Sequence, residues 1–276
     1  MKKFVISQGD VCATILPDFG GMVAELKICE VNVLRMDYNQ LGTANVLAGG
    51  IPVLFPFVSR CKNDEINFHG AVYTMPMHGF VKDMPFKVVD ASKSTCTLSL
   101  DSNEMTRRLF PFDFSLVLIY EVSASCLKTT LRIENRGEED MPFVAGYHPY
   151  FLTPDRSKTS FDFGLTEFWD YTRGDTEGNP LHGYRDGEIH LKDEHDTVFW
   201  NGNADAEIVS EEMGYRAKLL CNGMFNVITI CTMLENASCI EPWQGRPGAA
   251  TRQEECQWLV PGSAKEYTYT IHLEKL

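Results

Sequence analysis

A histidine inside an apolar, aromatic run is the first residue of this chain with the means to do chemistry. His148 stands in "AGYHPYF", residues 145–151, directly before Pro149. A residue before proline is pushed towards extended backbone geometry. Proline itself cannot donate a ladder hydrogen bond, so within a sheet it lies at an edge, a bulge or a strand end. We therefore expect His148 where a strand stops pairing, with its imidazole available as an acid or a base. A histidine with a purely structural role is the alternative.

A glutamate repeats this arrangement later in the chain. Glu241 ends the apolar part of "ASCIEPW", residues 237–243, and is followed by Pro242 and Trp243. Burial among apolar groups raises the pKa of a carboxyl group, and such a group is a usable base near neutral pH. The alternative is a glutamate that pairs with an arginine at a strand end.

Cationic and imidazole side chains follow a stretch punctuated by proline and phenylalanine. Arg60 lies in "GGIPVLFPFVSRCKN", residues 49–63, and "MHGFVKD", residues 77–83, contains His78 and Lys82. Arginine can direct its fork of donors at sugar hydroxyls or at a carboxylate. The alternatives are a surface arginine with a packed stem and a histidine that merely occupies a turn.

The elements that must position these groups are predicted to be strands. Five segments are rich in β-branched and aromatic residues and are bounded by turn-forming residues, as strands are: 114–122, 126–135, 216–221, 225–232 and 265–273. A hairpin is expected to turn at His69-Gly70. Helical periodicity is hard to find, and 203–213 and 249–256 each have room for a short turn.

Many short strands separated by turns predict an antiparallel sandwich or barrel. At 276 residues we expect one all-β domain over residues 1–276, a large antiparallel β-sandwich with few short helices. A concave sheet face would then hold a ligand between residues from several strands.

The charge balance excludes several partners. The net charge is −13, from 38 acidic against 25 basic residues, and no run of Lys or Arg stands out. Nucleic acid requires a basic footprint, so neither nucleic acid nor an anionic membrane surface is expected as a partner.

Nine scattered cysteines without a C-x-x-C motif indicate reduced thiols in a cytoplasmic protein, and neither a disulfide framework nor a zinc ribbon. The first residues make a poor signal peptide, and no apolar stretch is long enough for a membrane span. The histidines lack H-x-x-x-H or H-E-x-x-H spacing, and "EIHLKDEHD", residues 188–196, is expected to be a solvated loop. We therefore expect no metal and no cofactor.

Four motifs occur in a fixed order: "GIPVLFP" at 50–56, "HGF" at 78–80, "GYHPYF" at 146–151 and "EPW" at 241–243. In an all-β chain this combination resembles the aldose 1-epimerase (galactose mutarotase-like) family, especially its bacterial and hexose-6-phosphate-type branches. The resemblance runs from about residue 10 to residue 273. "HPYF" and the joint order are specific, whereas "HGF" or "EPW" alone is not. The resemblance implies a β-sandwich, a sugar substrate and metal-free interconversion of α and β anomers.

The resemblance also implies roles for individual residues. The family's general acid falls on His148, its general base on Glu241, its second active-site histidine on His78 and its sugar-binding arginine on Arg60. A sugar-gripping aspartate falls on Asp196 in "HDTVFW", residues 195–200, with Asp193 and Asp186 as rivals.

Two further residues are expected at the sugar. Trp243, or a phenylalanine near 55–57, would stack on its apolar face. Lys82 stands where relatives often have arginine in "HGFxR"; since lysine offers a point charge and not a fork, this weakens the argument for a phosphate clamp and mildly favours a neutral sugar.

Three other functions stay open. A glycoside hydrolase usually needs two carboxylates, whereas the best set here holds one carboxylate and two histidines. A non-catalytic sugar-binding or sensing protein would have the same fold. A hexose-6-phosphate 1-epimerase would act on a phosphorylated sugar.

Overall fold

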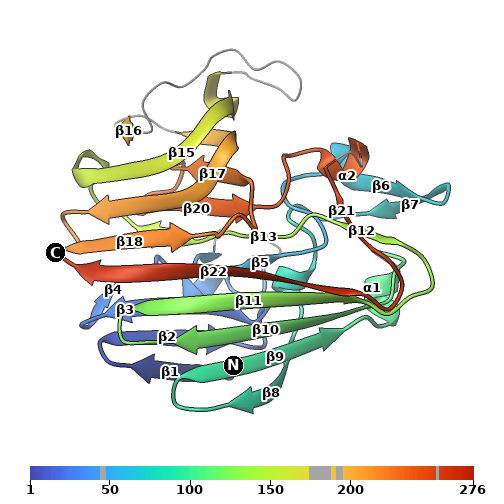
Figure 1. The fold of residues 1–276 in the computed structure, drawn as a ribbon, viewed down its shortest axis with the longest axis horizontal. Helices are drawn as coiled ribbons and strands as arrows, with labels where there is room; N and C mark the ends of the chain where they lie inside the picture. Colours follow the sequence, from blue (N-terminus) through green and yellow to red (C-terminus); the bar gives the residue numbers. More distant parts are fainter. Residues whose placement is uncertain (44–47, 174–187, 191–194, 253–254) are drawn as a thin grey trace.

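Antiparallel strands make up most of the structure, a computed structural model that describes residues 1–43, 48–173, 188–190, 195–252 and 255–276 (Figure 1). The described strands form one sheet of 14 strands, one of four, and two of two. The two α-helices are single turns, α1 (Glu104–Arg107) and α2 (Ala249–Arg252). Within the described ranges, no helix has the length and apolar character needed to cross a bilayer.

The large sheet forms a continuous path of antiparallel neighbours. In spatial order they are β5 (Val53–Leu54), β13 (Gly146–Tyr147), β20 (Ala237–Trp243), β19 (Val227–Cys231), β17 (Asp196–Ser210), β18 (Tyr215–Leu220), β22 (Ala264–Lys275), β11 (Cys126–Asn135), β10 (Phe114–Val122), β9 (Thr95–Asp101) and β8 (Lys87–Ala91). Three strands lie off this path: β14 (Tyr150–Leu152) pairs with β20, β15 (Thr159–Asp170) with β17, and β16 (Glu188–His190) with β15.

The three smaller sheets are one of four strands, near the N-terminus, and two of two strands each. The four-stranded sheet runs β1 (Phe4–Gln8), β2 (Val11–Leu16), β3 (Met22–Ile28) and β4 (Val31–Asn32). The pairs are β6 (Glu65–Phe68) with β7 (Ala71–Thr74), and β12 (Met141–Phe143) with β21 (Gln257–Leu259). Short 3₁₀ turns occupy Tyr38–Gln40, Lys62–Asp64, Val81–Asp83, Arg156–Lys158 and Tyr171–Arg173.

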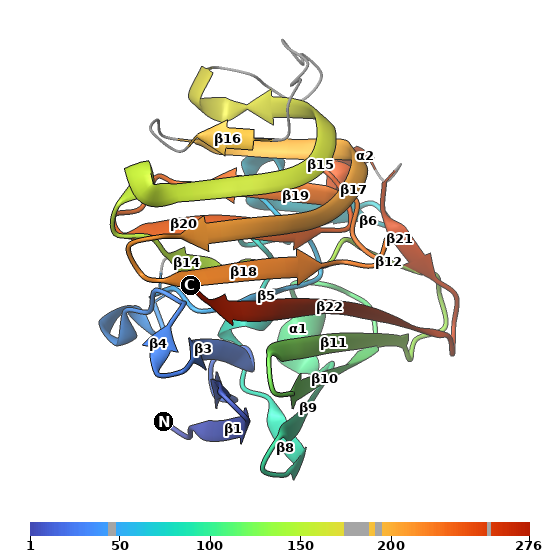
Figure 2. The same ribbon diagram turned by 60° about the vertical axis from the view of Figure 1, so that its left-hand side comes forward.

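The four-stranded sheet packs against β10, β11 and β22 of the large sheet, which makes the fold a sandwich (Figures 1 and 2). Strand β10 shows why: Leu116, Leu118 and Tyr120 are buried while the residues between them are only half-buried. This period of two turns one strand face to the core. Across the interface the Tyr120 hydroxyl donates to the Gly21 carbonyl at 2.8 Å. The predicted large antiparallel β-sandwich is confirmed.

Most of the predicted elements are found. Strands β10 and β11 have the expected bounds, and the hairpin of β6 and β7 turns at His69-Gly70. The short turn considered within 203–213 occurs only at the end of that range, at 211–214, because β17 runs on to Ser210. That strand is recognisable from its burial pattern. Its buried residues Ala204, Ala206 and Ile208 are spaced by two, the period of a strand.

The two prolines beside the ionisable residues behave differently. His148-Pro149 separates β13 from β14, as expected for a break in pairing. Pro242 is the last residue but one of β20, where pairing with β19 continues from Ile228 opposite Pro242 to Val227 opposite Trp243. The amides of Ile240 and Gln244 donate to the carbonyls of Pro149 and Ala145, which lie on the side of β20 that faces β13 and β14. Residues alternate along a strand, so the Pro242 nitrogen faces that side too, next to the break in the neighbouring strand. Because the neighbouring strand is interrupted at that point, the absence of an amide hydrogen on Pro242 removes little of the hydrogen bonding between strands.

A tight turn places His78 against the end of β5. His78 has φ 63° and Gly79 φ 72°. A Cβ on Gly79 would lie 2.1 Å from the carbonyl oxygen of Phe55, so only glycine fits. The amides of Phe80 and Val81 both donate to that same carbonyl, which fixes the turn.

Gly79→Ala should therefore destabilise the protein by roughly 3 kcal/mol, because a left-handed φ and a backbone clash act together. Gly70→Ala is the matched control: Gly70 also has a positive φ, 81°, but nothing lies within 4 Å of an added Cβ. The control should cost about 1 kcal/mol. Urea denaturation of both variants measures the difference, and equal costs would contradict the steric role given to Gly79.

Candidate active site

A cavity of about 170 Å³ lies where β17, β19 and β20 meet the His148-Pro149 segment and the His78 turn. Five of the seven predicted site residues line it: Glu241, His148, His78, Asp196 and Trp243. They come from positions spread over more than 160 residues of sequence, and sheet pairing brings them together.

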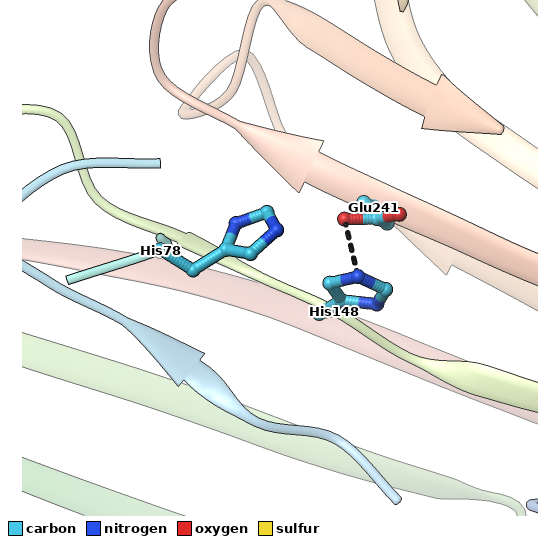
Figure 3. Close-up of side chains that lie close together, drawn as sticks. All are labelled: His78, His148 and Glu241. Atoms are coloured by element: carbon cyan, nitrogen blue, oxygen red, sulfur yellow. Dashed lines mark ion pairs between the residues drawn. The ribbon is translucent and has the colours of Figure 1, made fainter. Parts of the chain in front are cut away.

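The carboxylate of Glu241 and the imidazole of His148 face each other in this cavity. Glu241 Oε2 lies 3.2 Å from His148 Nε2 (Figure 3). The two atoms lie at ion-pair distance without hydrogen-bond alignment, and the pair is ionic only when His148 is protonated. Both side chains are almost fully buried, at 2% and 8% exposure.

Tyr150 fixes the plane of the His148 ring. The two rings stack with centroids 4.4 Å apart and an interplanar angle of 5°. The Tyr150 hydroxyl lies 3.3 Å from His148 Nε2, within hydrogen-bond distance. Below the ring, the amides of His148 and Tyr150 donate to the carbonyls of Pro52 and Gly50. The "GIPVLFP" motif therefore holds the backbone on which His148 is mounted.

Burial is the largest influence on the acidity of the pair. Desolvation raises the pKa of Glu241, and the neighbouring groups Cys231 and Asp196 raise it further, while the nearby Trp243 side chain opposes them. Burial likewise lowers the pKa of His148, with His78 as the second cause. Both shifts penalise the charged form.

The second histidine is held in one tautomer. The amide of Ser59 donates to His78 Nδ1 at 3.1 Å, and the amide of His78 donates back to the Ser59 carbonyl at 2.8 Å. Because Nδ1 accepts, the neutral ring has its proton on Nε2. Burial lowers the pKa of His78 to about 3, helped by the charges of Lys82 and Arg60. His78 is thus a neutral donor at physiological pH.

His78 and Trp243 complete the wall beside His148. The centroid of the His78 ring lies 5.2 Å from that of His148 and 5.7 Å from that of Trp243, both in edge-to-face contact. The indole nitrogen of Trp243 is buried with no hydrogen-bond acceptor among the described residues.

Asp196 reaches the cavity from the start of β17, opposite Cys231 of β19. Burial raises the pKa of its carboxyl, and Asp170 adds to this. The rival residues Asp193 and Asp186 lie outside the described residues.

Two predicted site residues lie elsewhere. The described residues that line the cavity do not include Arg60, whose side chain is 61% exposed and pairs with Asp64 at 2.9 Å. Lys82 is buried, forms an ion pair with Asp83, and lines a separate cavity of about 240 Å³ with Asp18 and Pro52. Their roles at the sugar stay predictions.

Several cavity residues have no recognisable signal in the sequence. Thr229 and Cys231 of β19, and Cys239 of β20, line the same wall as Glu241. Period-two spacing places 239, 241 and 243 on one face of β20, but only the register of β19 against β20 shows what lies beside them.

Three side chains of the cavity, those of His78, His148 and Glu241, are of the types that ligate metal ions. One ligand atom each from His78, His148 and Glu241 lies within 4.8 Å of the others. Two histidines and a glutamate can hold a metal ion. The same set can also transfer protons without one, since it combines a carboxylate, an imidazole and a fixed donor.

The architecture around this site matches solved structures. The chain is similar to the Slr1438 protein of Synechocystis sp. PCC 6803, with a TM-score of 0.91, 25% identity, and coverage of 100% of this chain and 96% of that one. It is also similar to a galactose mutarotase related enzyme of Lactobacillus acidophilus, with a TM-score of 0.82, 20% identity, and coverage of 99% and 98%. The fold is therefore a galactose mutarotase-like β-sandwich.

Sequence comparison gives the family. The aldose 1-epimerase family profile matches residues 2–219, so the chain belongs to the aldose 1-epimerase family. His78 and His148 lie inside the matched segment, whereas Glu241 and Trp243 follow it.

A curated relative is named "Putative glucose-6-phosphate 1-epimerase" of Escherichia coli (strain K12). It is 26% identical over 170 residues, which cover 60% of this chain and 51% of that protein. The match therefore spans about half the length of that relative.

The neutral state of His78 predicts a pH dependence of stability. Its pKa is lower in the folded protein than in the unfolded chain, so below about pH 6.5 the unfolded chain binds more protons and stability falls as the pH falls. His78→Gln removes this contribution. Between about pH 6 and pH 4 the free energy of unfolding should fall less steeply in the variant, by up to about 1.4 kcal/mol per pH unit. Denaturant titrations across this range measure both slopes; parallel slopes would show that His78 is not buried as a neutral ring.

Proposed function

We propose that this protein is an aldose 1-epimerase (mutarotase), which interconverts the α and β anomers of a neutral aldohexose by acid–base ring opening. The observation that carries the proposal is the 3.2 Å approach of Glu241 to His148 in a buried cavity. One sugar ring in this cavity can contact both groups.

Anomer exchange needs two proton transfers. A base takes the proton from the anomeric hydroxyl, and an acid protonates the ring oxygen as its bond to C1 breaks. The open aldehyde turns about the C1–C2 bond, and both transfers then run in reverse. A positioned acid or base contributes typically about 10²–10⁴-fold. We assign Glu241 as the base and His148 as the acid.

The burial of this pair suits the reaction. Before ring opening, Glu241 is a carboxylate and His148 an imidazolium; afterwards Glu241 is a carboxylic acid and His148 a neutral imidazole. Both states contain one proton, so the pair titrates as a unit. Burial disfavours both charges, which offsets the greater intrinsic acidity of a carboxyl. The two states are thereby brought closer in free energy, and the proton can pass through the sugar in either direction.

The other groups in the cavity serve the sugar. The Nε2–H of His78 is a fixed donor for the ring oxygen as negative charge develops there. Asp196 can accept from a hydroxyl, and Trp243 can pack on the apolar face of the ring while its indole N–H donates. Arg60 remains our candidate for a hydroxyl contact made when substrate is bound.

The lining of the cavity favours a neutral sugar. The described lining residues include Glu241 and Asp196 but neither lysine nor arginine, and a phosphate dianion beside two acids is unfavourable. A hexose-6-phosphate 1-epimerase is the second candidate because of the name of the Escherichia coli relative. In that case Lys82 would have to turn towards the substrate.

Three further features complete the proposal. The protein acts in the cytoplasm on a small-molecule sugar. Residues 1–276 form one domain, as the large sheet suggests by joining strands from residue 53 to residue 275. The acid–base steps assigned here need no metal or cofactor.

Glu241→Gln should abolish catalysed mutarotation, because an amide cannot accept the anomeric proton at neutral pH. The loss should be about 10²-fold or more, measured by polarimetry on freshly dissolved α-glucose and α-galactose. Glu266→Gln, on an exposed position of β22, is the matched control and should keep full activity. Circular dichroism checks that both variants fold. An active Glu241→Gln protein would end the assignment of the base.

Wild-type protein should accelerate the mutarotation of glucose more than that of glucose 6-phosphate, as judged by kcat/KM for the two sugars under one buffer condition. The physical reason is the absence of a cationic side chain from the described cavity lining. A preference for the phosphorylated sugar that disappears in Lys82→Met would favour the second candidate instead.

A further inference from the structure

Two cysteines lie side by side in the wall of the cavity. Cys231 ends β19, and Cys239 stands directly opposite it on β20. Both line the cavity that contains Glu241. Among the strand pairings that the structure describes, this is the one that sets two cysteines opposite each other.

Their backbones are spaced for a covalent bond. The Thr232 amide donates to His195 on the β17 side, and the Ile240 amide to Pro149 on the β14 side. Because neighbouring residues of a strand point their amides in opposite directions, Cys231 and Cys239 form a hydrogen-bonded pair with Cα atoms about 5.5 Å apart. Disulfides most often span about 5.5–6 Å between Cα atoms.

The two thiols differ in reactivity. Cys231 is partly exposed, whereas Cys239 is buried at 1% exposure. The neighbouring Cys239 thiol and the Met233 amide lower the pKa of Cys231, although burial and the Asp196 carboxylate oppose them. Burial raises the pKa of Cys239. An accessible, stabilised thiolate beside a protonated partner is the usual arrangement of an attacking and a resolving cysteine.

We propose that Cys231 and Cys239 form a thiol–disulfide site in the sugar cavity, in which Cys231 reacts first with a small disulfide and Cys239 resolves the product. The Cys231 thiolate attacks one sulfur of the small disulfide, whose S–S bond breaks, and one small thiolate leaves and takes up a proton. Cys239 then loses its proton to water, and its sulfur attacks Cys231 and displaces the second small thiol. The small disulfide is reduced to two thiols while the protein dithiol is oxidised to one cross-strand disulfide.

The first product has a consequence for the cavity. A mixed disulfide on Cys231 places its small thiol next to Glu241, in a space of about 170 Å³. It therefore excludes a sugar. This consequence rests on the proposed function, whereas the thiol chemistry does not.

The thiol chemistry is tested on the whole protein with bis(2-hydroxyethyl) disulfide, a small neutral disulfide, in a Cys29→Ser background that removes the one exposed cysteine. Intact mass should first show a mercaptoethanol adduct and then the loss of two hydrogens, with peptide mapping placing the link between residues 231 and 239. In Cys239→Ser the reaction should stop at the adduct on Cys231, and in Cys231→Ser no link should form. Cys126→Ser, which changes another half-buried cysteine, should react like its parent. Absence of the 231–239 link, or labelling of Cys126 as fast as Cys231, would overturn the proposal.

The consequence for the cavity is tested separately by polarimetry on the Cys239→Ser protein before and after modification. The fraction of mutarotation lost should equal the fraction of chains with the adduct, and dithiothreitol should restore it. Full activity in a fully modified sample would refute the blocking of the cavity while leaving the thiol site in place. Wild-type protein without mutarotation would instead refute the proposed function.

Discussion

The burial of one acid and one base in contact is the constraint on which the rest of the site depends. A carboxylate and an imidazolium are each destabilised when they are removed from water. Glu241 and His148 offset part of this penalty for each other, because their Oε2 and Nε2 atoms lie 3.2 Å apart. The surrounding structure preserves that arrangement: Tyr150 stacks on the His148 ring, the carbonyls of Gly50 and Pro52 hold its backbone, and β20 fixes Glu241 within a continuous strand.

His78 shows how the same burial produces a different role. Its Nδ1 is already used by the Ser59 amide, so the ring has one free position and a fixed proton there. A group that stays neutral over a wide pH range offers a constant dipole, whereas the proton transfer proposed for His148 depends on the carboxylate beside it. Two histidines 5.2 Å apart thus contribute different properties because their backbone neighbours differ.

The sequence predicted the type of fold, and it singled out five side chains that the structure brings to one cavity, for identifiable reasons. Alternating apolar residues in β10 and β11 indicate strands by themselves, and the motifs around His148 and Glu241 stand out because proline and aromatic residues accompany an ionisable group. The fate of Pro242 could not be predicted, because it depends on a break in a neighbouring strand nearly 100 residues away. The positions of the Lys82 and Arg60 side chains could not be predicted either. They pair with Asp83 and Asp64, and residue spacing along the chain does not determine which partner a charged side chain takes.

The position of Pro242 has an effect on strand alignment. If β20 moved by one residue against β19, the proline nitrogen would face an unbroken strand and leave one of its carbonyls without a donor. The same shift would turn the side chain of Glu241 to the opposite face of the sheet. Pro242 therefore destabilises the shifted alignment of β19 and β20 that would remove the Glu241 carboxylate from the cavity. In this way it helps to select the observed register of the two strands.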